Sequence, residues 1–284
     1  MKPLDPRDYI NPIIENAYST LHISGTLIPE VYRSLTSLND FPNSLIQRKM
    51  ISPFSKDQIR VLIVKGVTSK YIFRGLEMYR KINKCIREIL EIRKGNTGIF
   101  TVSYDFLGKL NSKKLGKDKL KFILSELERP FFEEERNRSS FDNSALIQKF
   151  KDSSEGNGAV LLGVLGGRNS EGEDYPGKTM ESVIIVGFPF PPPNGYLDKK
   201  EAYYNIIFPG KGYLYTNLEP TMRKANQAAG RPIRKDDDKA AIIFLDERYQ
   251  IEDNYIYLSE WLKNGDVISI IPSNQELKQN LIDF

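Results

Sequence analysis

The near-continuous apolar run Ala159–Leu165 is the feature of this sequence that most constrains its fold. It reads Ala-Val-Leu-Leu-Gly-Val-Leu and has no polar residue at alternate positions. Such a run is typical of a strand covered on both faces, as in a parallel sheet. Similar runs alternate with helical patterns, so we expect an α/β fold whose mostly parallel sheet is flanked by helices. We expect strands near residues 60, 97, 120, 159, 182, 240 and 267, and a closing helix from Ser273.

The counts of cysteine and histidine limit the kinds of site that this chain can contain. Cys85 is the one cysteine and His22 is the one histidine. Disulfide frameworks, cysteine-ligated zinc, an iron–sulfur cluster and any two-histidine metal site are therefore excluded within the chain. We expect no metal site in it.

Net charge and hydropathy do not identify a binding partner for this chain. The chain has 41 basic and 37 acidic residues, and its net charge of +4 does not by itself require a nucleic-acid partner. No stretch is long and apolar enough to cross a bilayer, and the opening residues 1–6 lack the apolar core of a signal peptide. We expect a cytoplasmic protein, nucleoid-associated if it is prokaryotic, with no membrane partner.

The run Gln227-x-x-Gly230-Arg231-x-x-Arg234 is the main candidate for a ligand site, with Gly230 expected to allow close packing. On a helix, positions 227, 231 and 234 share one face, which then presents an amide and two guanidiniums. Arginine offers forked, always-charged donors, so the pattern suits a polyphosphate. A solvated basic helix end is the alternative. Pro232 predicts that the helix ends or kinks near Arg231, which weakens the shared-face argument for Arg234.

Two further segments follow predicted strands, at the edge where open α/β sheets bind ligands. Ser103 and Tyr104 follow the strand near residue 97 and begin a helix, although a simple N-cap is the favoured interpretation of Ser103. The glycine-rich stretch 166–177 follows the strand near 159, and its glycines let the backbone approach a ligand closely. Ser170, Glu171 and Asp174 of that stretch supply acceptors at the strand's end.

A phosphate-binding loop is missing from the sequence. No G-x-x-x-x-G-K-[ST] run occurs in the 284 residues, a length that fits one large α/β domain or one and a half. If the chain works on ATP, it therefore does so with half of a site.

Together these segments resemble the motifs of superfamily 2 helicases. The run 227–234, followed by an aspartate cluster, a strand and residues 246–249, resembles motif VI, and the stretch 166–177 resembles motif V. The segment Ser19–Leu27 resembles motif III, and the segment at Ser103 resembles motif IV. More narrowly, the chain resembles the XPD/DinG-like DNA helicases of the archaeal XPD type.

The resemblance implies a role for each candidate residue. Arg231 and Arg234 take the place of arginine fingers that sense the γ-phosphate of ATP. The residues implied on the nucleotide side are Gln227, Gly230, Glu171 and Asp174. The residues implied in DNA contact are Ser103, Tyr104, Ser170 and Gly172.

The resemblance also implies a domain organisation. Residues 1–38 would be the end of motor domain one, with a motif III-like strand at 19–24, and a linker; residues 39–284 would be a RecA-like motor domain two with motifs IV, V and VI. Motor domain one, which is missing here, would hold most of the ATP and Mg²⁺ contacts. The iron–sulfur cluster of the family would lie outside this chain. The implied partners are motor domain one and single-stranded DNA.

The resemblance thus implies an ATP-dependent 5′-to-3′ DNA helicase in the full-length context, with this chain inactive alone because it lacks the Walker A loop. A nucleic-acid-binding or regulatory module that keeps the helicase fold without ATPase activity is an open alternative. An unrelated α/β hydrolase or transferase is disfavoured, because the sequence has no serine–histidine pair and no metal cluster.

Overall fold

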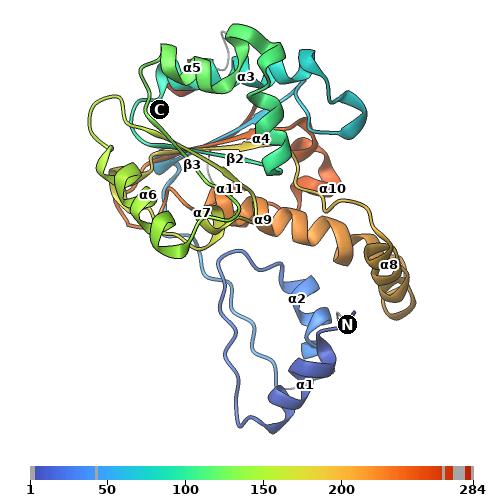
Figure 1. Cartoon of the computed structure of the whole chain (residues 1–284). Helices are drawn as coiled ribbons and strands as arrows, with labels where there is room; N and C mark the ends of the chain where they lie inside the picture. Colours follow the sequence, from blue (N-terminus) through green and yellow to red (C-terminus); the bar gives the residue numbers. More distant parts are fainter. Residues whose placement is uncertain (1–3, 42–43, 264–265, 271–278, 283–284) are drawn as a thin grey trace. The chain divides into compact units, whose positions relative to one another are not determined.

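The apolar runs form one parallel sheet in the computed structural model, which describes residues 4–41, 44–263, 266–270 and 279–282. The strand order is β3-β4-β2-β5-β6-β1-β7, and every strand pair is parallel (Figure 1). The predicted mostly parallel α/β sheet is confirmed. The strands are β1 (Ile59–Val64), β2 (Thr97–Thr101), β3 (Phe131–Glu133), β4 (Val160–Val164), β5 (Ser182–Val186), β6 (Ala240–Leu245) and β7 (Asp266–Ile270).

One face of the sheet is covered by α3 (Leu76–Ile92), α4 (Tyr104–Leu110) and α5 (Leu120–Glu126) (Figure 1). Ile82 and Ile86 of α3 lie four residues apart and are fully buried in one apolar cluster with side chains of the central strands. This spacing puts both on one helix face, so a single amphipathic stripe joins α3 to the core.

The other face is covered by α6 (Ser140–Asp152), α7 (Arg168–Glu171) and the C-terminal part of α9 (Glu219–Ala229) (Figure 1). Here the rings of Phe150 and Tyr175 meet edge to face, with centroids 5.9 Å apart. Helices on both faces explain why the strands are continuously apolar, since neither side of the sheet meets water. The short helices α10 (Glu252–Tyr255) and α11 (Glu260–Lys263) follow β6.

The strand predicted near residue 120 is wrong, because that segment is α5. Leu120, Ile123 and Leu124 are its buried residues, and their spacing of three and four is the helical period. The sheet position is taken instead by β3, a three-residue edge strand inside a charged stretch. With three residues, β3 is too short to show an alternating pattern.

Two terminal predictions have different outcomes. Residues 19–24, expected to form a strand, join no sheet within the described part of the chain. The closing helix predicted from Ser273 begins outside the described residues.

Contacts between backbone positions divide the chain into two compact units. The larger contains Pro53–Pro189 and Lys224–Phe284, and therefore the whole sheet; the smaller contains Met1–Ser52 and Phe190–Arg223. The motor-domain boundary expected at residue 38 refers to a longer helicase, and it stays a prediction.

The smaller unit has its own aromatic core. Its elements are α1 (Arg7–Asn16), α2 (Pro29–Leu35), α8 (Gly195–Ile207) and the π-helical turn Leu214–Leu218. Tyr204 and Tyr215 are buried together with Val31, and the two tyrosine rings meet edge to face at 5.8 Å. Burial of these large rings stabilises the packing within this unit.

Parallel pairing puts the carboxyl ends of all the strands at one edge of the sheet. The segments that follow β2 and β4 begin there, as do those that follow β1 and β6. Residues 165–181 then lead from the end of β4 to the start of β5, and so from the carboxyl edge back to the amino edge.

Candidate functional site

The helix that carries the motif VI-like run stops where the sequence predicts. α9 ends at Ala229, and the N–H of Arg231 still donates to the carbonyl of Ala228 at 3.1 Å. Pro232 follows at once, so the helix does not continue to Arg234. The close-packing role expected of Gly230 is wrong for this chain, because an added Cβ would meet its nearest atom at an ordinary 3.6 Å.

Arg231 is held by main-chain oxygens. Arg231 is buried, with 8% of its surface exposed. Its Nε donates to the carbonyl of Gln227 at 3.2 Å, and its Nη1 donates to the carbonyl of Glu173. Burial, and then the nearby positive charge of Arg234, lower the pKa of Arg231 from its ordinary value. The side-chain Oε1 of Gln227 is buried and accepts no hydrogen bond from any described residue.

Asp174 brings the two arginines together. Its Oδ1 lies 3.1 Å from Nε of Arg234 and 4.0 Å from Nη1 of Arg231. The carboxylate is 77% exposed and comes from the stretch between β4 and β5. Two guanidiniums therefore share one exposed anionic oxygen. They do so although α9 ends before Arg234, so the two arginines do not lie on one helix face as the sequence spacing predicted.

Asp238 shapes the backbone around this cluster, and sequence reasoning missed its role. The residue is buried, and its carboxylate accepts from the N–H groups of Arg234 at 2.6 Å, Lys235 at 2.7 Å and Gly177 at 3.1 Å. It thus joins the segment after α9 to the end of the glycine-rich stretch. The aspartate cluster was visible in the sequence, but no pattern distinguishes the buried member from its neighbours.

The stretch after β4 turns sharply and then forms one short helix, α7. Gly166 has a φ of +78°, which favours glycine. Ser170 is fully buried, and its hydroxyl donates to the carbonyl of Gly167 at 3.0 Å. Glu171 and Gly172 are more accessible, at the C-terminal end of α7.

Ser103 and Tyr104 lie where β2 gives way to α4. The Oγ of Ser103 accepts from the N–H of Phe106 at 3.1 Å, so Ser103 is the N-cap of α4, as the simpler interpretation predicts. The Tyr104 hydroxyl donates to Oε1 of Glu134 at 2.8 Å. Burial, and then that contact with Glu134, raise the pKa of Tyr104 to about 12.

Glu134 was not singled out in the sequence. It lies in the charged stretch directly after β3, yet it is only 5% exposed. Burial raises the pKa of its carboxyl, while the Tyr104 hydroxyl and nearby backbone N–H groups act in the opposite direction. Glu134 stands among other glutamates in the sequence, and composition alone does not show which of these carboxylates faces the interior.

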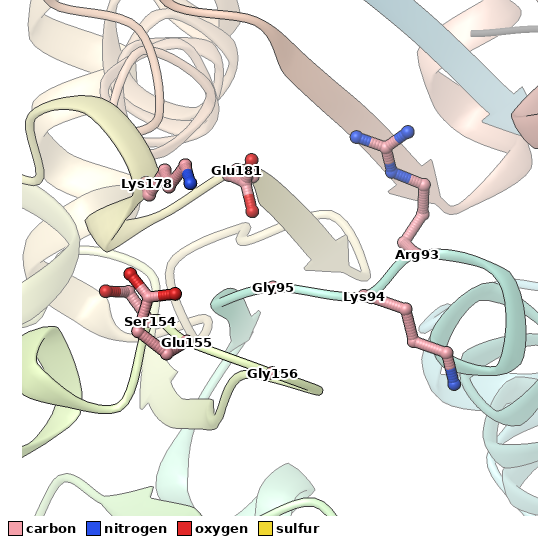
Figure 2. A pocket seen from close by; sticks show the side chains of 8 residues that line it. All are labelled: Arg93, Lys94, Gly95, Ser154, Glu155, Gly156, Lys178 and Glu181. Atoms are coloured by element: carbon pink, nitrogen blue, oxygen red, sulfur yellow. The ribbon is translucent and has the colours of Figure 1, made fainter.

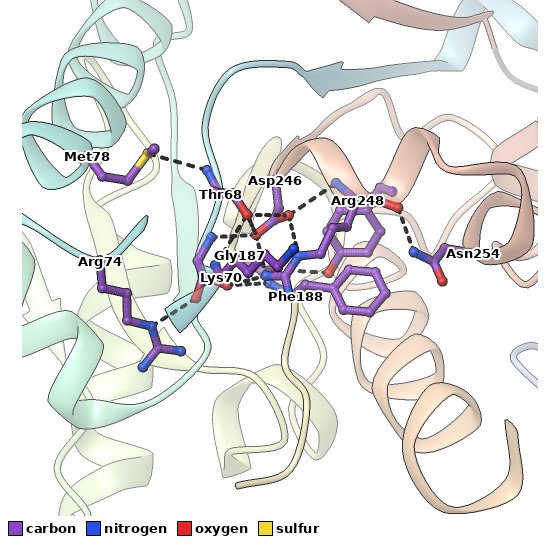
Figure 3. A network of polar contacts seen from close by, with 11 residues as sticks. Thr68, Lys70, Arg74, Met78, Gly187, Phe188, Asp246, Arg248 and Asn254 are labelled. Carbon is purple, nitrogen blue, oxygen red and sulfur yellow. Dashed lines mark hydrogen bonds and ion pairs between the residues drawn. The ribbon is translucent and has the colours of Figure 1, made fainter. Parts of the chain in front are cut away.

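The buried carboxylate of Asp246 is the centre of a hydrogen-bond network at the carboxyl edge of the sheet (Figure 3). Asp246 follows β6, is fully buried, and accepts from Nε and Nη2 of Arg248, each at 2.8 Å. It also accepts from the N–H of Ser69 at 2.7 Å. The Ser69 hydroxyl receives the N–H of Phe188 at 2.9 Å and Nη2 of Arg248 at 2.7 Å. This network joins the segments that follow β1, β5 and β6.

A cavity of about 360 Å³ lies at the opposite, amino edge of the sheet (Figure 2). Its lining residues are Arg93, Lys94, Gly95, Ser154, Glu155, Gly156, Lys178 and Glu181. None of them was predicted as a site residue, and their charges are mixed.

Membrane-spanning helices and clustered metal ligands are both absent from the described residues. No helix in that part of the chain has the length and apolarity to cross a membrane. No group of three or more histidine, cysteine, aspartate or glutamate side chains is placed there to hold a metal ion.

This chain is similar to curated proteins that are named as helicases. "ATP-dependent DNA helicase chl1" of Aspergillus clavatus is 27% identical over 321 residues, which cover 99% of this chain and 42% of that protein. "Regulator of telomere elongation helicase 1 homolog" of Aedes aegypti is 31% identical over 271 residues, which cover 87% of this chain and 25% of that protein. The chain therefore spans less than half the length of these relatives.

The fold is that of a helicase motor domain. A solved structure named "XPD_Helicase" matches 95% of this chain and 46% of its own chain, with a TM-score of 0.67 and 22% sequence identity. A second, named "XPD_APO", matches 94% of this chain and 52% of its own, with a TM-score of 0.64. The predicted RecA-like fold is confirmed. The family described as "Helicase C-terminal domain" matches residues 86–265, and the chain therefore belongs to it, within the XPD/DinG-like group of superfamily 2.

Proposed function

We propose that this chain is the second motor domain of an ATP-dependent 5′-to-3′ DNA helicase. In this proposal Arg231 and Arg234 act on ATP that is held, with Mg²⁺, mainly by motor domain one. The chain alone is inactive, because its sequence contains no phosphate-binding loop. The observation that carries the proposal is the convergence of both guanidiniums on Oδ1 of Asp174.

The residues around Asp174 fit a polyphosphate. A carboxylate oxygen and a phosphate oxygen are both anionic acceptors, so an incoming γ-phosphate can replace Asp174 as the partner of Arg234. Asp174 is exposed and its ion pair is solvent-screened, so this exchange costs little. ATP supplies the phosphoryl group, and the arginines stabilise the negative charge that develops on it.

The individual arginines have different tasks in this proposal. Arg231 is fixed by the carbonyls of Gln227 and Glu173, which pre-orients its guanidinium. Arg234 is half-exposed and free to turn from Asp174 towards a ligand on a facing domain. The side-chain Oε1 of Gln227 is buried, so Gln227 contributes to the nucleotide side through its backbone carbonyl, which fixes Arg231. Glu171 and Gly230 belong to the same nucleotide side.

Single-stranded DNA is proposed to contact the carboxyl edge. Ser103 and Tyr104 follow β2, and Ser170 and Gly172 follow β4, whose neighbour in the sheet is β2. Because the Ser170 hydroxyl is buried, its contribution is to shape the backbone that meets the DNA rather than to touch it. Gly172 offers accessible backbone to phosphate oxygens.

The test joins this chain to motor domain one of a relative and measures DNA-stimulated ATP hydrolysis. Arg234→Ala should lower the rate by about a thousandfold or more, since a finger arginine contributes on that scale. Arg231→Lys should lower it too, with a folded state checked by thermal melting. Arg223→Ala is the matched control, because Arg223 also lies on α9 but pairs with Glu219 at the surface.

A nucleic-acid-binding module without ATPase activity is the second candidate. The observation in its favour is that the Arg231 guanidinium donates to main-chain oxygens, as a structural arginine does. Hydrolysis that is absent in all forms of the joined protein, while single-stranded DNA still binds, would decide for this candidate. Hydrolysis that is equal with and without the Arg234 guanidinium would instead overturn the role of Arg234 as a finger.

A further inference from the structure

Glu134 is a buried carboxylate that none of the helicase-like motifs includes. Its backbone N–H donates to the carbonyl of Leu162 at 2.8 Å, which continues the pairing of β3 with β4 for one residue. Its side chain then turns into the protein, where Oε1 accepts the hydroxyl of Tyr104 at 2.8 Å. Its Oε2 is buried and accepts no hydrogen bond from the described residues.

Two glycines make room for this carboxylate. A Cβ built on Gly163, in β4, would lie 2.7 Å from Oε2, and one built on Gly167 would lie 2.5 Å from Oε1. Real Cβ atoms do not approach so closely, so any side chain at either position would displace Glu134. The carboxyl group is therefore packed directly against the end of β4 and the turn that follows it.

The position of Glu134 links two segments that are separate in the sequence. Tyr104 begins α4 after β2, and residues 166–172 follow β4. Burial raises the pKa of Glu134, whereas the nearby backbone N–H groups of Val164, at the end of β4, and of Arg168 and Asn169, within residues 166–172, lower that pKa and favour the ionised form. The Glu134 carboxylate therefore contacts both the start of α4, at Tyr104, and the turn after β4, at Gly167.

A carboxylate is an expensive group to bury for packing alone. Removing its charge from water is unfavourable, whereas an apolar side chain of similar volume has no such desolvation penalty. A buried polar group of this sort restricts its partners to one arrangement, because any other leaves a charge unpaired.

We infer that Glu134 is a positioning residue that locks residues 166–172 against Tyr104, so that the two DNA-contacting segments move as one. This inference rests on the proposed function for its DNA-contacting role. The geometry itself, one carboxylate between Tyr104 and the turn after β4, stands independently of that function.

The first arm of the test uses this chain alone and measures amide hydrogen exchange. Glu134→Gln keeps the size of the side chain but removes its charge. It should raise exchange in both residues 103–107 and residues 166–172 by about tenfold, as expected for a local opening made easier by the loss of one charge-assisted hydrogen bond. Tyr104→Phe should do the same in both segments. Glu133→Gln is the matched control, since Glu133 pairs with Lys121 at the surface.

The second arm uses the joined two-domain protein and measures ATP hydrolysis against the concentration of a single-stranded oligonucleotide. Glu134→Gln should raise the concentration for half-maximal stimulation by about tenfold while the maximal rate falls far less. The double variant Tyr104→Phe/Glu134→Gln should be no worse than Glu134→Gln, because both changes remove the same link.

The outcomes separate the two claims. Exchange that stays unchanged, or changes in one segment only, overturns the inference whatever the activity. A normal response to DNA in Glu134→Gln overturns it as well. If the unsubstituted joined protein is not stimulated by DNA, the proposed function fails, and the exchange arm still decides whether Glu134 locks the two segments.

Discussion

The Nε atom of Arg234 lies 3.1 Å from Oδ1 of Asp174, although the two residues are 60 positions apart in the sequence. The exposed carboxylate of Asp174 forms an ion pair with the guanidinium of Arg234, whereas the buried carboxylate of Asp238 accepts a hydrogen bond from the backbone N–H of Arg234. The two carboxylates therefore contribute in different ways, and substitution separates them.

Asp174→Asn should change the free energy of unfolding by less than about 1 kcal/mol, because an exposed ion pair is screened by water. Asp238→Ala should lower it by about 2–3 kcal/mol, because three backbone N–H groups lose their acceptor. Urea unfolding measures both. Asp237→Asn, at an exposed neighbouring position, is the control. Equal losses for the substitutions at 174 and 238 would contradict this division.

Arg248→Ala should lower the free energy of unfolding by about 3–5 kcal/mol, because it leaves the fully buried Asp246 without its paired cation. Arg223→Ala, which breaks a surface pair with Glu219, should cost no more than about 0.5 kcal/mol. Thermal or urea unfolding gives the comparison. The Thr68 hydroxyl also donates to Oδ1 of Asp246, at 3.3 Å. A small loss for Arg248→Ala would mean that Thr68 and Ser69 satisfy Asp246 without the arginine.

Gly158→Ala should be strongly destabilising, by about 2 kcal/mol or more, since its φ is +66° and the new Cβ would lie 2.1 Å from the carbonyl carbon of Gly95. Gly108→Ala is the matched control. Gly108 is inside α4 with open space around it, so alanine there should stabilise by about 0.5–1 kcal/mol. Unfolding midpoints of the two variants test this contrast, and similar midpoints would refute it.

Cys85 should resist alkylation in the folded chain. Its thiol is buried, and burial first of all raises its pKa to about 12. The reactive thiolate is therefore scarce at pH 8, and iodoacetamide should react at least about a thousandfold more slowly than with the denatured chain. Mass spectrometry before and after addition of denaturant measures the difference. Rapid labelling of the folded chain would show that α3 opens readily.

The sequence was most informative where one local rule decides the outcome. Pro232 ended α9 near Arg231, and Ser103 became an N-cap because its position fitted one. It was least informative where local rules compete. The segment at residues 120–126 contains both apolar runs and helical spacing, and packing against α3 selected the helix.

The sequence by itself determined the parallel sheet, because apolar runs that no water can reach are stable only between two layers of helices. It also pointed to Arg231, Arg234 and Asp174 through their resemblance to helicase motifs. Only the tertiary structure decided which groups these side chains meet, and it brought in Asp238 and Glu134, which lie among other acidic residues. The physical reason is that burial depends on long-range packing, and a carboxylate in a charged stretch carries no local sign that it will face inward.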